Sequence, residues 1–209
     1  MLYIRKGQVP QELIEDRVTP GSDFDGLRKE PIRHALLEEQ GYLCAYCMCR
    51  IEDTYQSTKI EHYKPRSCYP ALQMDYGNML AVCHGGEGGD PAHYTCDTKK
   101  GDKELRINPQ EPSHMKTIRY YDDGRIDSTN DDFRQDIKIL NLNDTGLIGK
   151  RVSALNALKQ KLYEMFKERT ATQRSMEKLL QQIEMQMPKR PFCGILIWYL
   201  QKRLAVTRM

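Results

Sequence analysis

The sequence lacks both a long apolar segment and an export signal. Its longest apolar run has nine residues, from Phe192 to Leu200, whereas a helix needs about 20 apolar residues to cross a bilayer. The chain does not open on a basic stretch followed by an apolar one, so we expect no cleaved signal peptide. These absences argue against a membrane protein and a secreted toxin, and we expect a cytoplasmic location without a membrane partner.

An excess of one charge and low-complexity tracts are also missing. The 209 residues include 32 lysines and arginines against 29 aspartates and glutamates, a net charge of +3, and the mean hydropathy is −0.70. Tryptophan occurs once, but 12 tyrosines and 4 phenylalanines can support a globular core, which excludes a wholly disordered chain. The length allows one domain, or two small ones that share a core.

The small net charge hides an uneven distribution. Residues 150–209 contain 13 basic and 4 acidic residues, a net charge of +9, and residues 1–149 contain 19 and 25, a net charge of −6. Such a basic segment binds a polyanion or an acidic protein, or it forms helices with solvated basic faces. Residues 59–106 contain seven residues of each sign. This middle segment therefore has no net attraction for a polyanion, and the basic tail or a partner would have to supply it.

The local patterns predict an α+β protein in three parts. Residues 1–41 are expected to form a strand and a helical segment, residues 42–110 a compact core, and residues 111–209 a β-hairpin followed by a helical lobe. The expected elements are an edge strand over 1–6, a helix over 31–40, a hairpin over 117–126 turning at Gly124, and helices over 131–140, from 145 onward, over 172–187 and over 192–204.

Cysteine is abundant, with seven residues at positions 44, 47, 49, 68, 83, 96 and 193. In a chain without an export signal, clustered cysteines favour metal binding or catalysis over disulfides. A CxxC turn can present two thiolates to one Zn²⁺, and the glycine-rich insert 85–89 can loop out to bring a second pair together. The expected ligands of a structural zinc ion are Cys44, Cys47, Cys83 and Cys96.

Other assignments of the cysteines stay open. Cys49, His84 or His93 could replace one of the four ligands, because each lies close to them in the sequence. Reduced thiols that pack as small apolar side chains are the alternative to a metal site. Cys68 and Cys193 have no paired spacing and are expected to be ordinary thiols.

Between and after the cysteine pairs lies a second set of polar residues. Glu61-His62 follows the CxxC turn, Asn78 comes sixteen residues after the histidine, and Asp97 directly follows the last cysteine. This order resembles the HNH (ββα-metal) endonuclease family, in the subgroup whose motif is held by a zinc ion on four cysteines. The resemblance covers residues 42–102, and the combination is more specific than any single piece.

The resemblance implies a metal-dependent endonuclease that hydrolyses phosphodiester bonds of DNA, with RNA as an open alternative. In the family the histidine is the general base, which falls on His62, and an unperturbed histidine pKa near 6.5 suits that role. The family places ligands of a catalytic Mg²⁺ or Mn²⁺ at the positions of Glu61 and Asp97. It places at Asn78 a residue that fixes the loop behind the base and in some members contacts the metal.

The sequence departs from the usual family pattern at two ligands. The family usually has Asp at the position of Glu61 and His at that of Asp97, although carboxylate oxygens suit Mg²⁺ equally well. His93 or His84 could therefore be the third ligand instead of Asp97. The residues expected to contact the phosphate backbone are Lys64, Arg66, Lys99 and Lys100.

A narrower resemblance is to the PtuB-like HNH proteins that are encoded with an ATPase in Septu and retron anti-phage systems. The motifs that carry it are LCAYC over 43–47, IEHYKPR over 60–66, CDTKKG over 96–101 and ILNLN over 139–143. In that group an acidic residue after the last cysteine is the norm, which favours Asp97. The resemblance implies an SMC/ABC-type ATPase partner, which the basic tail or the first 40 residues would bind.

Two interpretations from other classes compete with a nuclease. A non-catalytic zinc-stabilised module that binds nucleic acid or protein would use the same cysteines, but it would not need Glu61-His62 near Asn78. A CxxC thiol oxidoreductase would leave the second cysteine pair unexplained, and no βαβ pattern follows Cys47. The motifs therefore favour the nuclease.

Overall fold

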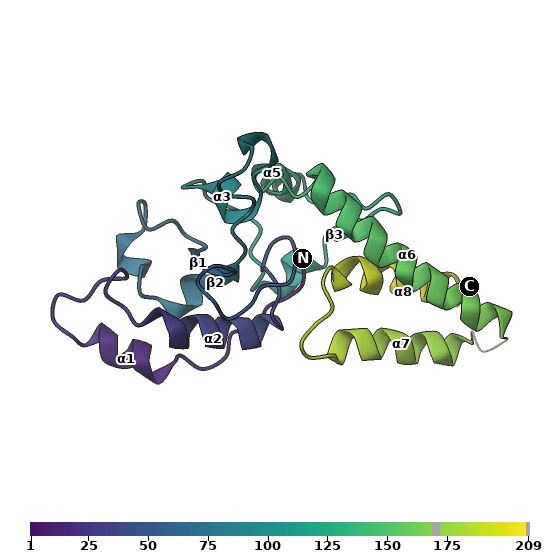
Figure 1. Ribbon diagram of the computed structural model, residues 1–209, viewed down its shortest axis with the longest axis horizontal. Helices are drawn as coiled ribbons and strands as arrows, with labels where there is room; N and C mark the ends of the chain where they lie inside the picture. Colours follow the sequence, from purple (N-terminus) through teal and green to yellow (C-terminus); the bar gives the residue numbers. More distant parts are fainter. Residues whose placement is uncertain (169–171, 208–209) are drawn as a thin grey trace.

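The structure is a computed structural model that describes residues 1–168 and 172–207. It is an elongated α+β molecule with two small sheets. Figure 1 shows β1, β2 and helices α1 to α3 in one half, α6 to α8 in the other, and the N-terminus between them. The helices are α1 (Gln11–Arg17), α2 (Lys29–Gln40), α3 (Cys96–Lys100), α4 (Pro112–Met115), α5 (Asp131–Ile139), α6 (Thr145–Lys167), α7 (Gln173–Met185) and α8 (Cys193–Thr207). The strands are β1 (Lys59–His62), β2 (Met79–Val82), β3 (Ile118–Tyr120) and β4 (Ile126–Ser128).

Helix α2 supports the first sheet. Ile32, Leu36 and Leu37 are fully buried on one face, and Gly41 ends the helix with a left-handed φ of 63°. The buried side chain of Gln40 donates to the Ala81 carbonyl (2.7 Å) and accepts from the Ala81 amide (2.9 Å). These bonds fix the C-terminal end of the helix, which was predicted over 31–40, to β2.

Strands β1 and β2 form an antiparallel pair in which Glu61 faces Leu80 and His62 faces Met79. All four residues of β2 are buried. The connection from β1 to β2 is a long loop with two short 3-10 turns, Pro70–Leu72 and Tyr76–Asn78. The pair therefore carries Glu61 and His62 on a strand that is held by a fully buried neighbour.

The predicted hairpin is formed by β3 and β4, and Gly124 lies in its turn with a φ of 84°. A Cβ atom at this glycine would lie 2.7 Å from the Ile148 carbonyl oxygen, so the turn packs closely against α6. The buried guanidinium of Arg151 donates to the carbonyls of Gly124 (2.5 Å) and Leu142 (2.6 Å). One arginine thus joins the hairpin, the segment before α6 and α6 itself.

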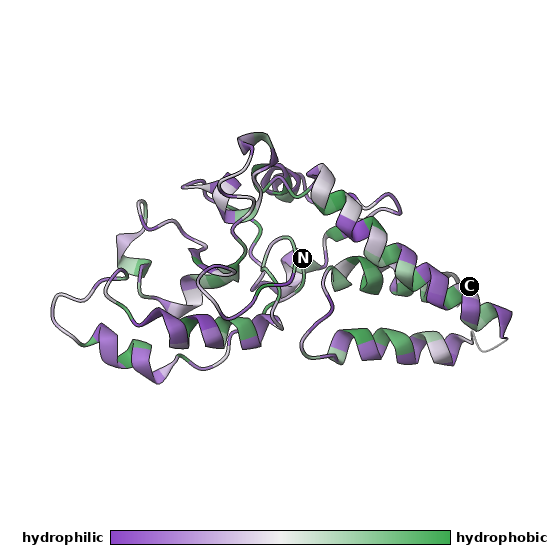
Figure 2. Cartoon of the chain, viewed as in Figure 1, coloured by the Kyte–Doolittle hydropathy of each residue, from purple (hydrophilic) through white to green (hydrophobic). Residues whose placement is uncertain are grey.

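The helical lobe consists of α6, α7 and α8. Asp144 caps α6, and Thr172 with Ser175 forms a capping box at the start of α7. Helix α8 packs against both other helices, and its residues are largely apolar (Figure 2). Among the described residues, no helix has the length and apolar character needed to cross a membrane.

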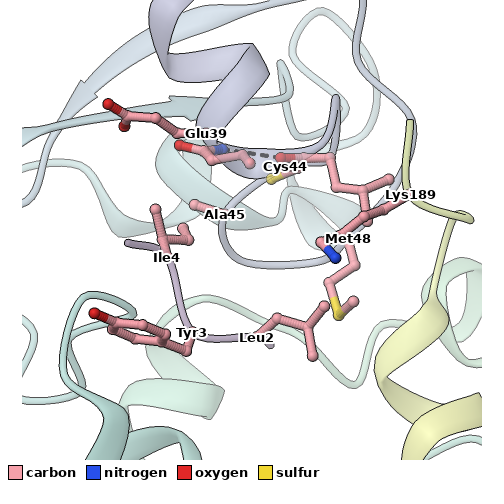
Figure 3. A pocket seen from close by; sticks show the side chains of 10 residues that line it. Leu2, Tyr3, Ile4, Glu39, Cys44, Ala45, Met48 and Lys189 are labelled. Carbon is pink, nitrogen blue, oxygen red and sulfur yellow. Dashed lines mark hydrogen bonds between the residues drawn. The ribbon is translucent and has the colours of Figure 1, made fainter. Parts of the chain in front are cut away.

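The N-terminal segment differs from the prediction. Residues 1–6 form no strand, and their backbone bonds to the body run from the Ile4 amide to the Pro109 carbonyl (2.9 Å) and from the Met1 amino group to the Tyr120 hydroxyl. Figure 3 shows Leu2 and Ile4 beside Ala45 and Met48, around a cavity of about 20 Å³. Met1 and Ile4 are buried here and Leu2 is half-buried, and no strand among the described residues pairs with this segment.

Candidate metal centre and cleft

The four expected cysteines lie together. The Sγ atoms of Cys44, Cys47, Cys83 and Cys96 are all within 4.8 Å of one another. Cys44 and Cys96 are 3.8 Å apart, and Cys47 and Cys83 are 3.7 Å apart. Four thiolates around Zn²⁺ at about 2.3 Å place neighbouring sulfurs roughly 3.8 Å apart in a tetrahedron. The cluster predicted from the spacing is confirmed, and its thiolates and separations fit a metal such as zinc.

The CxxC turn forms because its backbone bonds to itself and to β2. The Met48 amide donates to the Cys44 carbonyl (3.0 Å), and the Cys44 amide donates to the Cys49 carbonyl (3.0 Å). The Ala45 amide donates to the Ala81 carbonyl (3.1 Å). The turn is therefore attached to the strand that leads directly to Cys83.

A close backbone contact brings Cys83 and Cys96 together across their twelve-residue insert. The Thr95 amide donates to the Gly85 carbonyl (2.9 Å), and Gly85 has a φ of 57°. A Cβ atom at Gly85 would lie 2.0 Å from the Thr95 carbonyl oxygen, so a side chain does not fit. The predicted loop closure thus depends on Gly85 rather than on the flexibility of the whole glycine-rich insert.

The alternative ligands have other partners. The ring nitrogens of His84 lie 3.2 Å from a Glu87 carboxylate oxygen and 3.0 Å from the Tyr55 carbonyl oxygen. Nδ1 of His93 lies 2.7 Å from a carboxylate oxygen of Asp144. Cys49 is near the cluster but outside the group of four. None of the three belongs to the group of four among the described residues, and neither histidine lines the cleft described next.

An open cleft of about 380 Å³ lies between β1 and α3. It brings together the predicted residues Glu61, His62 and Asp97, which come from two separate elements. The cleft is lined by Lys59, Ile60, Glu61, His62, Pro65, Arg66, Glu87, Asp97, Thr98, Lys100, Gly101 and Asp102. Asn78, Lys64 and Lys99 do not line it.

Two carboxylates are close together in this cleft. Glu61 is 5% exposed, accepts from the Tyr46 hydroxyl (3.1 Å) and lies 2.7 Å from the Lys100 ammonium. Burial, together with the neighbouring carboxylate of Asp97, raises the pKa of Glu61 to about 8 against the opposing effect of the Lys100 ammonium. A pair of carboxylates at the wall of a cleft can hold a hard divalent cation such as Mg²⁺ or Mn²⁺.

His62 has a defined tautomer. Its Nε2 lies 2.8 Å from the Gln73 carbonyl oxygen, and its ring makes an edge contact with Phe24 at 4.5 Å between centroids. Because a carbonyl oxygen only accepts, Nε2 carries the hydrogen and Nδ1 of the neutral ring is the free acceptor. Burial lowers the pKa of His62, and the nearby charges of Arg66 and Lys100 lower it further. The ring is therefore neutral at neutral pH.

Asn78 lies behind the histidine. The Lys64 amide donates to the Asn78 side-chain oxygen (2.7 Å), and its side-chain nitrogen donates to the Lys64 carbonyl (3.0 Å). The Tyr63 amide donates to the Asn78 carbonyl (2.9 Å). This arrangement holds the chain that leaves β1, in keeping with the loop-fixing position that the resemblance implies.

The predicted phosphate contacts occupy different environments. Lys64 pairs with Glu104 (2.8 Å), and Arg66 pairs with Asp25 (2.9 Å). Lys99 is exposed. The ammonium of Lys100 is buried against Glu61, so the expectation that it contacts phosphate does not match its position.

Lys59 also lines the cleft and was not predicted from the sequence. Its ammonium lies 2.7 Å from a Glu87 oxygen and 3.8 Å from an Asp97 oxygen at the wall of the cleft. The signal was available, because residues two apart on a strand share a face and Lys59 is two residues before Glu61. Tyr46 was missed because its contact with Glu61 depends on how the CxxC turn packs on β1.

The fold and the site define a mixed α+β protein in which four clustered cysteines that could hold a metal lie beside a cleft lined by carboxylates and a histidine. No family model matches the chain. The chain is similar to the Septu protein PtuB of Bacillus thuringiensis, with 29% identity over 192 residues. The match covers 88% of this chain and 66% of the length of that relative.

Proposed function

We propose that the protein is a metal-dependent endonuclease with an HNH-type ββα-metal core, and that it hydrolyses phosphodiester bonds of DNA. The observation that carries this proposal is the convergence of Glu61, His62 and Asp97 on one cleft beside the cysteine cluster. The two carboxylates belong to β1 and to the helix that begins at Cys96. A site for a metal-assisted hydrolysis needs such a carboxylate pair and a base that is neutral at working pH.

In the proposed mechanism, Glu61 and Asp97 would hold a divalent cation, and this cation would supply Lewis-acid stabilisation of the phosphate and of the leaving oxygen. His62 takes a proton from the attacking water at Nδ1, because Nε2 is committed to the Gln73 carbonyl. Asn78 keeps the chain after His62 in place. Arg66 lines the cleft and can leave its exposed partner Asp25 to bind the phosphate.

The cysteine centre has a structural part in this mechanism. Cys96 directly precedes Asp97, and the Cys96 amide donates to the Leu140 carbonyl (2.9 Å). Because the two residues are adjacent, holding the Cys96 sulfur also holds the Asp97 carboxylate in place. A structural zinc ion contributes directly to folding free energy. Loss of the metal would therefore displace Asp97 together with the cysteine that precedes it.

The similarity to a Septu protein supports a role as the nuclease effector of an anti-phage defence system. On this proposal an SMC/ABC-type ATPase partner restrains the nuclease until infection is sensed. The candidate docking regions are residues 1–41 and the basic helical lobe. The match covers 66% of the relative's length. The activity, the substrate and the partner of this chain are therefore proposed and do not follow from the match alone.

A binding module is the second candidate, and the paired charges in and next to the cleft favour it. Lys59, Lys64 and Arg66 each have a carboxylate partner within 3 Å. Cations that are already paired contribute little to phosphate attraction until their partners are displaced. A zinc-stabilised module that binds protein would tolerate such a cleft.

Plasmid cleavage separates the two candidates. The wild-type protein is incubated with supercoiled plasmid and Mg²⁺ or Mn²⁺, alone and with the product of any adjacent ATPase gene. His62→Ala should lower the nicking rate by about 10²–10⁴-fold, the usual contribution of a general base. The matched control is His34→Ala, which removes an exposed histidine outside the cleft.

Either of two results would contradict the proposal that the protein is a nuclease. The His62→Ala protein could nick plasmid at the wild-type rate, which would assign the activity to a contaminant or to another group. The wild-type protein could also fail to cut DNA and RNA in the presence of its partner, which would favour the binding module.

A further inference from the structure

Lys100 occupies an unusual place for a lysine. Its side chain is 1% exposed, and its ammonium lies 2.7 Å from Oε1 of Glu61. The same ammonium donates to the carbonyls of His62 (3.2 Å) and Gly101 (3.4 Å). Lysine is almost never fully buried unless it is paired, so the burial of this side chain is tied to these three oxygens.

The contacts of Lys100 determine which oxygen of Glu61 is occupied. Oε1 accepts from the ammonium and also from the Tyr46 hydroxyl (3.1 Å). Both donors use the same oxygen, and the other carboxylate next to Glu61 is that of Asp97. Lys100 and Tyr46 thus hold the Glu61 carboxylate by Oε1 at the cleft wall that it shares with Asp97.

Lys100 also links the two elements that form the cleft. It lies three residues after Asp97 on α3, where residues i and i+3 are neighbours, and it reaches both Glu61 and the His62 carbonyl on β1. The last zinc ligand, a cleft carboxylate and this lysine therefore lie within five consecutive positions, 96–100.

We propose that Lys100 is a positioning residue that aligns Glu61 for the divalent cation and fixes β1 against α3. This inference rests on the proposed function, because it assigns a role toward the cation of the same site. Lys100 acts through Glu61 and does not contact the phosphate. Side chains that orient a metal ligand typically contribute about 10–100-fold to metal affinity or activity.

The test compares Lys100→Met with the control Lys103→Met, which removes an exposed lysine three residues away. Mn²⁺ binding is measured from the electron paramagnetic resonance signal of the free ion, after subtraction of the binding that remains in Asp97→Asn. Lys100→Met should bind Mn²⁺ about 10–100-fold more weakly, with wild-type zinc content. Lys103→Met should bind like the wild type.

The direction of the change in Mn²⁺ affinity shows whether Lys100 aligns Glu61 or only repels the cation. Removing a positive charge from the neighbourhood of a cation site should by itself tighten cation binding. If Lys100→Met binds Mn²⁺ more tightly than the wild type, Lys100 is only a competing cation and the proposal is overturned. If the variant does not fold, Lys100→Gln, which keeps polar donors, is measured in the same way and judged by the same sign.

A double-mutant cycle shows whether Lys100 acts through Glu61. In a Glu61→Gln background, Lys100→Met should have no further effect on Mn²⁺ affinity, because interacting residues are not additive. A further loss as large as in the wild-type background would overturn the proposal. The binding readout also separates this inference from the proposed function, since weakened Mn²⁺ binding can be measured in a protein that never cleaves DNA.

Discussion

At the scale of single residues, Gly85 tests how the metal centre is assembled. Gly85→Ala would place a Cβ atom 2.0 Å from the Thr95 carbonyl oxygen, at a φ of 57°. Gly88 also has a positive φ, of 84°, but a Cβ atom there would meet no other atom within 4 Å. Both substitutions strain the backbone by about 1–2 kcal/mol, and only Gly85→Ala should also open the Cys83–Cys96 pair.

The measurement is zinc content together with thermal denaturation of the two variants. Gly88→Ala should retain one zinc ion per chain and lose little stability. Gly85→Ala should lose zinc and melt at a clearly lower temperature. Equal melting temperatures and equal zinc contents in the two variants would show that the Gly85–Thr95 contact does not close the site.

The raised pKa of Glu61 predicts how the stability of the protein depends on pH. This pKa is raised from 4.5 to about 8 by burial and by Asp97, so the folded state binds the proton more tightly than the unfolded state. Stability without a divalent cation should therefore fall as pH rises from about 4.5 to about 8. Glu61→Gln does not titrate and should lack this fall.

Melting temperatures of wild type and Glu61→Gln across pH 5 to 8, without added divalent cation, check the prediction. As the pH rises, the melting temperature of the wild type should fall relative to that of Glu61→Gln. Added Mg²⁺ should restore the melting temperature of the wild type. Parallel curves for the two proteins would mean that Glu61 is ionised over the whole range.

Single residues were predictable where spacing alone sets the chemistry. The CxxC pair and the cysteine before Asp97 follow from the sequence, because short spacing limits where the sulfurs can lie. Lys100 could not be assigned in this way. Its neighbour Lys99 is chemically identical and exposed, and only the packing of α3 on β1 decides which of the two ammonium groups meets Glu61.

At the scale of elements, Arg151 is the main connection within the C-terminal part. Within the part of the chain that the structure describes, its buried guanidinium donates to uncharged oxygens, namely the carbonyls of Gly124 and Leu142 and, at 3.5 Å, the Asn143 side chain. Arg151→Met would leave two buried carbonyls without these donors and should reduce the free energy of unfolding by about 3 kcal/mol. The control Lys150→Met changes an exposed neighbour and should change it by less than about 0.5 kcal/mol.

Urea denaturation of both variants measures these changes. A stability loss below about 1 kcal/mol for Arg151→Met would mean that water or a local shift satisfies the two carbonyls. The expected loss of stability would explain why an arginine follows the ILNLN segment 139–143. This segment, the hairpin turn and α6 all meet at the Arg151 side chain.

Elements with their own periodicity or turn signal were predicted well. The hairpin around Gly124 and the helices of the lobe are observed close to their expected bounds. Helix α1, which has seven residues and no side-chain cap, gave no signal in the sequence. The strand expected at 1–6 was wrong because strand pairing depends on a neighbour, and the local pattern of apolar residues cannot supply one.

At the scale of the whole molecule, the lobe cannot be treated as a detachable tail. Helix α8 buries Cys193, Ile195 and Leu200 completely, and the Phe192 amide donates to the Met48 carbonyl (2.9 Å) beside the cysteine centre. Removing residues 150–209 would expose the core. A test of the basic lobe must therefore change its charge and leave its packing intact.

The exposed lysines of the lobe provide that test. Lys161, Lys167 and Lys178 lie on α6 and α7 and are exposed, so changing all three to Gln should leave the fold intact. If they contact phosphates, the slope of log affinity for DNA against log salt should become shallower by about 0.9 per lost contact. Fluorescence anisotropy of labelled duplex DNA over a range of salt concentrations measures the slope.

The matched control changes Lys103, Lys116 and Lys138, three exposed lysines outside the lobe, to Gln. Both triple variants have the same net charge, so a difference between them reports position and not total charge. The lobe variant should lose affinity and show a shallower salt dependence, while the control should keep most of its affinity and its slope, because its three lysines lie outside the lobe. Equal losses in the two variants would show that DNA responds only to the net charge of the molecule, and the lobe would then be left as a surface for an acidic protein partner.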